Sequence, residues 1–137
     1  MGRVLNFESA GRARTKTTKA IVKAMRELML QQEANQKTKD LAAFIAIGLA
    51  EIHESVDVSV SAWEKRGYWV KADRFRLEWE WSKQFSDELV THLLRNDWQQ
   101  IAIIIAKTAQ KLNHIQISAN NRIGEPWLGA FDKLMNK

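Results

Sequence analysis

Three histidines, two of them with carboxylates close by in sequence, are the residues best suited to metal or acid–base chemistry. Glu51 and Glu54 flank His53, and Glu88 stands four residues before His92, a spacing that puts both on one helix face. A di-iron bundle needs Glu-x-x-His twice, and a zinc protease helix needs His-Glu-x-x-His. Neither pattern occurs in the sequence. We therefore predict no metal site and no cofactor, and interpret Glu88 and His92 as a solvated pair.

Motifs for nucleophilic or nucleotide-dependent catalysis are also missing from the sequence. It contains no Gly-x-Ser-x-Gly elbow, no phosphate-binding P-loop and no dinucleotide fingerprint. Sixteen acidic residues allow many carboxylate pairs, but helix surfaces carry such charges for solubility. We predict no catalytic residue, and we rank a helical enzyme or metal protein third, behind two non-enzymatic functions.

The residue composition limits the class of protein. The chain has 137 residues, 45% of them hydrophobic and 27% charged, which is the usage of one globular domain. It has no Cys, which excludes disulfides and thiolate metal sites and suits a cytoplasmic location. The longest uncharged apolar run, residues 41–50, is about half the length that a membrane-spanning helix needs. We therefore expect no membrane span.

The positive charge is concentrated at the N-terminus. Residues 1–26 hold seven basic residues and one acid, Glu8, a net charge of +6, whereas the remainder holds 14 basic and 15 acidic residues. We predict a basic N-terminal arm over residues 1–17, followed by one helical-bundle domain over residues 18–137. Such an arm can bind nucleic acid phosphates, an acidic protein or a membrane surface, or it can be an inert tail. The candidate binding residues are Arg12, Arg14, Lys16, Lys19 and Lys23.

The spacing of apolar residues predicts an all-α fold. Apolar positions recur every three or four residues from Thr18 to Met29, again from about residue 38, from Trp69 to Arg95, and after a cap at Asn96 or Asp97. Residues 113–124 are expected to form an irregular connector, and Pro126 to open a short terminal helix. The expected architecture is an antiparallel bundle of four main helices with a short C-terminal helix.

Two glycines and one short segment are exceptions within the helical spacing and need an explanation. Gly48 lies within the apolar stripe of the second helix, where a close helix crossing would explain it, and Gly67 is a candidate left-handed helix end. Residues 56–61 alternate like a strand, yet they also prolong the helical stripe. Because a lone strand is not stable, we expect a continued helix or a brief break there.

The third predicted helix carries two apolar stripes. Trp79 and Trp81 are two positions apart, so on a continuous helix their side chains point about 200° apart and cannot face one core. Either this helix packs on both sides within the bundle, or one stripe is left for a second copy of the chain or for another partner. We favour a homodimer, with an interface formed by Val70, Leu77, Trp81 and Phe85.

Basic and aromatic residues alternate within residues 65–81, a mixture that also suits single-stranded nucleic acid. We prefer a structural interpretation, with the aromatic residues in the core and the ion pairs Arg74–Glu78 and Arg76–Glu80 on the surface. The sequence therefore predicts a non-enzymatic interaction or assembly module that self-associates through the third helix. The alternative is a small accessory nucleic-acid-binding protein that uses the basic arm.

Overall fold

The computed structural model describes residues 6–136, and all regular structure in that range is helical. The predicted all-α class is confirmed. The helices are α1 (Phe7–Met29), α2 (Gln36–Lys65), α3 (Trp69–Trp79), α4 (Trp81–Leu94), α5 (Trp98–Lys111) and α6 (Ala130–Met135). None of them is long and apolar enough to cross a membrane.

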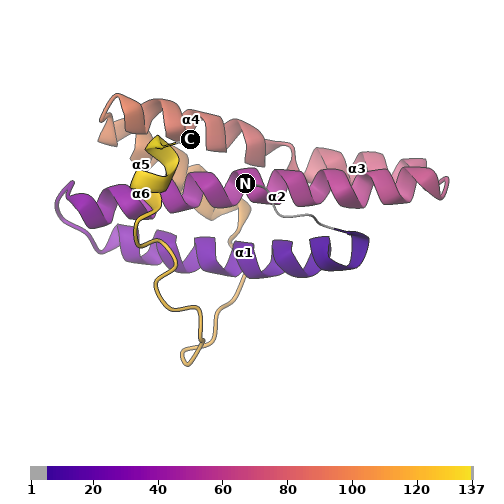
Figure 1. Cartoon of the computed structure of the whole chain (residues 1–137), viewed down its shortest axis with the longest axis horizontal. Coiled ribbons are helices and arrows are strands. Elements are labelled where there is room, and N and C mark those ends of the chain that lie inside the picture. The colour runs from indigo at the N-terminus through magenta and orange to yellow at the C-terminus, as the bar shows by residue number, and fades with distance from the viewer. Residues whose placement is uncertain (1–5, 137) are drawn as a thin grey trace.

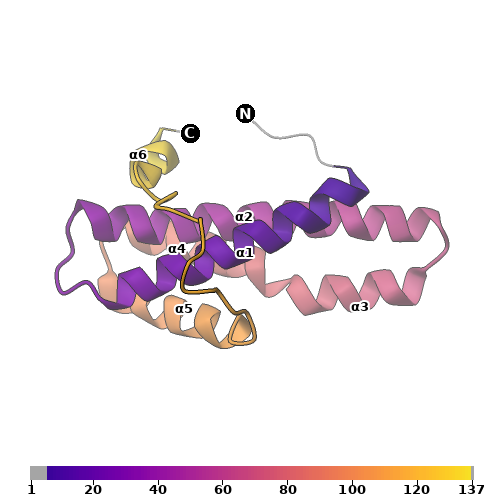
Figure 2. The same ribbon diagram turned by 90° about the horizontal axis from the view of Figure 1, so that it is seen from below.

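The two longest helices, α1 and α2, lie side by side and run in opposite directions (Figures 1 and 2). At the end of α2 the chain turns back, so that α3 and then α4 pack along α2. Helix α5 packs on α4 and touches α1, and α6 rests on α2. The half of the hairpin formed by the end of α2 and by α3 therefore extends beyond α5 and α6 (Figure 2).

The N-terminal arm predicted over residues 1–17 is wrong for residues 7–17, which form the first three turns of α1. Asn6 Oδ1 accepts from the Ser9 backbone N–H at 2.9 Å, and Ser9 Oγ accepts from the Asn6 N–H at 3.0 Å. These reciprocal bonds satisfy two amide groups that a helix start leaves without partners. Residues 1–5 of the predicted arm lie outside the described residues.

Helix α2 supplies the centre of the core. It begins at an Asn35–Thr38 capping box and continues without a break through residues 56–61, whose conformation the sequence left open. Val56 and Val60 are buried on the same face as Leu49 and Ile52, which is why the helical stripe prevails over the strand-like alternation. Gly48 lies where α2 crosses α1: an added β-carbon would stand 2.8 Å from Ile21 Cδ1. The close crossing predicted at Gly48 is confirmed.

The helix predicted from Trp69 to Arg95 is two helices, because the α-helical pattern is interrupted at Glu80. Glu80 itself keeps right-handed helical dihedral angles, φ −63° and ψ −26°, so the interruption redirects the helix without a loop. Asp97 Oδ1 accepts from the Gln100 N–H and so caps α5. Of the two predicted cap residues, Asn96 and Asp97, the cap is therefore Asp97. The terminal helix begins at Ala130 and not at Pro126, because Gly129 adopts φ +78°.

Candidate interaction surface on the third helix

The connection between α2 and α3 is a tight turn. Gly67 adopts φ +80°, as predicted for a left-handed helix end, and its N–H donates to the Glu64 carbonyl. The Tyr68 N–H donates to the Trp63 carbonyl at 2.9 Å. These hydrogen bonds satisfy the backbone groups of the turn. Residues 68–70, which follow the turn, lie at the far end of the hairpin.

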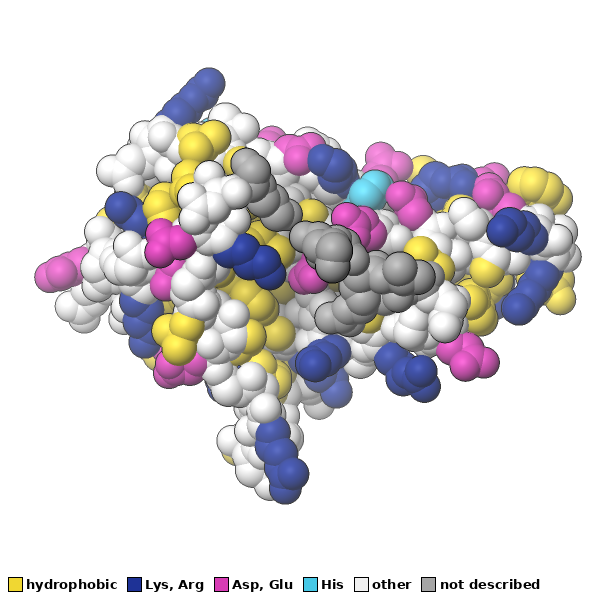
Figure 3. Space-filling model, viewed as in Figure 1, with side chains coloured by type: hydrophobic (Ala, Val, Ile, Leu, Met, Phe, Trp, Pro, Cys, Tyr) yellow, Lys and Arg dark blue, Asp and Glu magenta, His cyan; other side chains and the backbone are white. Residues whose placement is uncertain are grey.

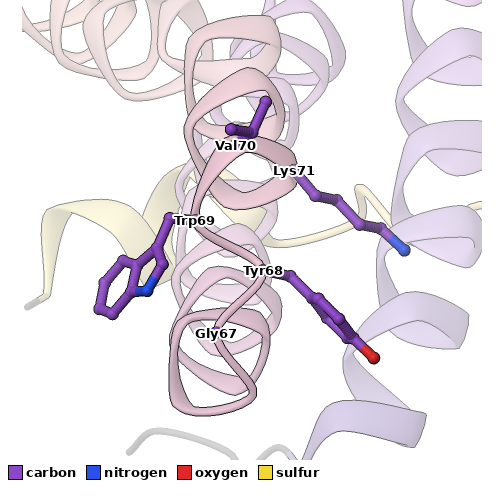
Figure 4. A pocket seen from close by; sticks show the side chains of 5 residues that line it. All are labelled: Gly67, Tyr68, Trp69, Val70 and Lys71. Carbon is purple, nitrogen blue, oxygen red and sulfur yellow. The ribbon is translucent and has the colours of Figure 1, made fainter.

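Large apolar side chains at this end of the molecule are open to solvent. The exposed fractions are 55% for Tyr68, 59% for Trp69, 67% for Val70 and 67% for Leu77. Figure 4 shows Tyr68 and Trp69 pointing to opposite sides of the hairpin end, with Lys71 on the side of Tyr68. Val70 and Leu77 are seven residues apart and share one stripe of α3. Tyr68 and Trp69 form the tip; Val70 and Leu77 form what we call the α3 stripe.

The predicted interface is divided by the break at Glu80. Val70 and Leu77 are exposed, whereas Trp81 is 9% exposed and Phe85 8% exposed. Trp81 and Phe85 lie in α4 and belong to the core that α4 forms with α2. These two residues are therefore corrected from interface to core positions, and only the α3 half of the predicted stripe is available at the surface.

The interruption also brings together two rings that we expected to face apart. Trp79 and Trp81 stack with their centroids 5.8 Å apart and their planes at 25°. A continuous helix would separate them by about 200°, so the expectation failed because the helix is not continuous. The stack belongs to a series of neighbouring rings that runs along the hairpin: Phe7, Trp63, Phe75, Trp79, Trp81 and Phe85.

Four exposed basic residues surround the tip: Lys65, Arg66, Lys71 and Arg74. Within residues 6–136, none of them forms a salt bridge. Arg76 differs from them, because its two guanidinium nitrogens contact Glu64 and Asp73, each at 2.7 Å. The expected pair Arg76–Glu80 is therefore replaced by these two contacts. The hydrogen bonds that Arg76 donates to the Glu64 and Asp73 carboxylates raise the pKa of Arg76 above its ordinary value.

The predicted basic binding residues of the N-terminus are all in α1, but they have different surroundings. Arg12, Lys16 and Lys19 are exposed and line a shallow hollow with Gly11 and Thr15. Figure 3 shows Lys and Arg side chains projecting along the edge that α1 forms.

The other two predicted binding residues make contacts within the fold. Lys23 donates to the Gly124 carbonyl at 2.7 Å and lies over the Trp127 ring. Lys23 therefore holds the connector between α5 and α6 against α1. The remaining residue, Arg14, is half-buried between helices.

The Arg14 side chain contacts residues of α2 and α3. Its Nη1 donates to Ser55 Oγ at 3.2 Å and to Ser59 Oγ at 3.4 Å, and its guanidinium lies 4.7 Å from the centre of the Phe75 ring. Burial lowers the pKa of Arg14 below its ordinary value, and the Glu78 carboxylate partly opposes this effect. Arg14 thus joins α1 to α2 and α3, which the interpretation as a free basic arm did not foresee.

The histidines do not assemble into a site. His53 Nε2 lies 3.6 Å from Asp57 Oδ2 on the outside of α2. The Glu88 Oε2 and His92 Nδ1 atoms are shielded from solvent and have no hydrogen-bond partner, which differs from the solvated pair that we expected. Among the described residues, no group of three or more His, Asp or Glu side chains is arranged to hold a metal ion.

Two features were not indicated by the sequence analysis. The first is an apolar groove of about 550 Å³ between the end of α1, the loop after it and α5, lined by Leu28, Met29, Trp98, Ile101 and Ile105 among others. The second is Asp40, a buried carboxylate that accepts from the Gly129 and Phe131 backbone N–H groups at 3.2 and 3.0 Å. An Asp followed by an apolar helical run is typical of a helix start, and nothing in its spacing connects Asp40 with a segment 89 residues away.

No protein-family model, no curated protein and no solved structure matches this chain.

Proposed function

We propose that the protein is a non-enzymatic interaction module, built as an antiparallel four-helix bundle, that self-associates into a homodimer through the α3 stripe. The exposure of Val70 and Leu77, two-thirds each, is the observation that carries this proposal. Large aliphatic side chains such as Val and Leu are more often buried than exposed. A partner that covers this part of α3 would remove both side chains from contact with water. The absence of Cys supports a cytoplasmic location for this module.

The energy available from the α3 stripe sets the expected strength of the dimer. Complete burial of a Val or Leu side chain contributes roughly 1.5–3 kcal/mol, so burying the exposed two-thirds contributes about 1–2 kcal/mol. In a two-fold interface each residue occurs twice, which gives about 4–8 kcal/mol from the four side chains. Because association itself costs about 4–15 kcal/mol, the stripe needs help from neighbouring contacts, and we expect a dissociation constant no tighter than about 1 μM.

The solution mass tests this proposal. Light scattering coupled to size exclusion, over a range of loading concentrations, should show the mass rise from 15.8 kDa toward twice that value. The combined substitutions Val70→Gln and Leu77→Gln should keep the protein monomeric without disturbing the core, since both side chains are exposed. Leu94→Gln is the matched control, because Leu94 is 66% exposed at the end of α4.

Two results would refute dimerisation through α3. One is a mass that stays at the monomer value at the highest concentration reached. The other is a dimer that Leu94→Gln disrupts and the α3 double substitution does not. Circular dichroism of each variant distinguishes a lost interface from a lost fold.

A second candidate function is the binding of nucleic acid through the exposed face of α1. Its support is the helical spacing of Arg12, Lys16 and Lys19, which puts three cations on one face. Phosphate contacts of this kind predict an affinity that falls steeply with salt. Changing the three residues together to Gln should abolish binding to a labelled oligonucleotide at low salt, and binding that survives this change would reject α1 as the site.

A further inference from the structure

The end of the α2–α3 hairpin differs from the α3 stripe in shape and in charge. It lies at one extreme of the molecule's long axis, away from α5 and α6 (Figures 1 and 2). Tyr68 and Trp69 diverge from this end and do not form the walls of an enclosed site (Figure 4). The phenol of Tyr68 and the indole of Trp69 are both more than half exposed there, and with Gly67, Val70 and Lys71 they border an open hollow.

Two of the four cations around the tip lie over aromatic rings, which do not neutralise their charge. The Arg66 guanidinium lies 5.0 Å from the centre of the Phe7 ring, and the Lys71 ammonium 4.5 Å from that of the Trp63 ring. Cation–π contacts of this kind orient a side chain and leave its positive charge in place. The carboxylates of Glu64 and Asp73, which are nearby in sequence, are occupied by Arg76. Lys and Arg side chains project at this end of the molecule, with Asp and Glu side chains among them (Figure 3, right-hand end).

This combination matches the chemistry of an anionic lipid surface. Trp and Tyr favour the boundary between lipid headgroups and acyl chains, because their rings are apolar and carry one polar group. Basic residues beside them are attracted to anionic headgroups. Single-stranded nucleic acid fits less well, because it requires a groove that follows the backbone and aromatic rings on which successive bases stack. Tyr68 and Trp69 point to opposite sides of the hairpin end, so they do not offer one face on which successive bases could stack (Figure 4).

We propose that the α2–α3 hairpin end docks on an anionic lipid bilayer. Trp69 and Tyr68 enter the headgroup region, and Lys65, Arg66, Lys71 and Arg74 contact the lipid phosphates and carboxylates. This proposal goes beyond self-association and depends on the residues of the tip. Val70 borders the tip, whereas Leu77 lies further along α3.

Co-sedimentation of the full-length protein with vesicles tests the proposal. The protein should bind vesicles of phosphatidylcholine mixed with phosphatidylserine far better than vesicles of phosphatidylcholine alone, and added salt should weaken binding. Each basic residue near an anionic surface contributes roughly fivefold, so Lys65→Glu with Arg74→Glu should lower the partition coefficient at least about 25-fold. Trp69→Ala should lower it roughly tenfold through the apolar area that no longer leaves water.

Matched controls separate the tip from the overall charge and from self-association. Lys107→Glu with Lys111→Glu makes the same change in net charge on exposed positions of α5, and it should have a much smaller effect than the pair at the tip. Leu128→Ala removes an equally exposed apolar side chain elsewhere and should leave binding unchanged. Leu77→Gln alone, a change in the α3 stripe away from the tip, should retain vesicle binding even where it weakens the dimer.

Three outcomes would overturn the proposal. They are equal binding to neutral and anionic vesicles, an equal loss in the α5 charge pair and the tip pair, and displacement from the vesicles by an oligonucleotide at lower concentration than by soluble phosphoserine. The last would assign the tip to nucleic acid. Because solution mass and vesicle binding are read from separate variants, either proposal can fail while the other stands.

Discussion

Replacing Gly48 by Ala tests the close approach of α1 and α2 at the centre of the fold. The added β-carbon would lie 2.8 Å from Ile21 Cδ1, 2.9 Å from Ile21 Cγ1 and 3.3 Å from Thr17 Cγ2. Carbon atoms pack at about 3.5–4.0 Å, so Ile21 or the whole of α2 must shift. Ile21 is completely buried and has little free space into which it can move.

Two opposing free energies determine the size of the effect. Ala is better than Gly in a helix interior by about 0.8–1.0 kcal/mol, whereas adding a methyl group to a well-packed core costs about 1–3 kcal/mol. We expect the steric cost to prevail, with a net loss of roughly 1 kcal/mol of unfolding free energy. Gly11→Ala is the matched control, since Gly11 is also within a helix but the new β-carbon would meet only Arg14 Nη2, at 4.0 Å. That variant should gain about 0.8–1.0 kcal/mol.

Urea unfolding followed by circular dichroism measures both effects by linear extrapolation. The same substitution should change sign in an Ile21→Ala background, because the two obstructing atoms are then absent and the new methyl group enters the vacated space. If Gly48→Ala stabilises the unmodified protein as much as Gly11→Ala does, the helices are further apart than the structure places them. The reasoning about the crossing would then be wrong.

Three further substitutions test single contacts. Asp40→Ala should lower the free energy of unfolding by about 1–3 kcal/mol, because two N–H groups at the start of α6 lose their acceptor. Amide hydrogen exchange at residues 129–135 should accelerate, and unchanged protection there would contradict the role of Asp40. Arg14→Ala should lower the free energy of unfolding by about 1–2 kcal/mol, whereas Lys16→Ala should change it by less than about 0.5 kcal/mol; equal effects in urea unfolding would argue against a structural role for Arg14. Gly67→Ala should lower the free energy of unfolding by about 1–2 kcal/mol through the φ of +80° alone, since nothing lies within 4 Å of the new β-carbon. Gly67→Asn should lower the thermal stability less, and an equal loss for both variants would exclude backbone strain as the cause.

Helical periodicity was sufficient to predict the all-α class and the stripe that places α2 at the centre. The break at Glu80 escaped prediction because its sequence has neither Gly nor Pro, and Glu80 itself keeps helical dihedral angles. A signal was nevertheless present, since Trp79 and Trp81 cannot both face one core on a continuous helix. The conflict between these two positions was interpreted as a spare surface, whereas the chain removes it by redirecting the helix.

The basic N-terminus was mistaken for an arm because the cap at its start is a weak signal. Asn6 and Ser9 form a capping box in which Ser takes the place usually held by Glu or Gln. The role of Arg14 depends on Ser55, Ser59 and Phe75, which are more than 40 residues away in sequence. Charge counting along the chain could not separate Arg14 from Arg12 or Lys16, because only the packing of α1 on α2 and α3 makes them different.

The tether between Asp40 and α6 has a consequence for the order in which the protein folds. A helix of six residues is too short to persist by itself in water, so α6 forms only against the surface of α2 that receives it. Its acceptor, Asp40, is 89 residues before Gly129, and that surface emerges early in synthesis. A nascent chain can therefore complete the hairpin of α1 and α2 while the Asp40 carboxylate is still in water. Its desolvation is deferred until residues 129–131 arrive, so α6 docks after the hairpin of α1 and α2 has formed.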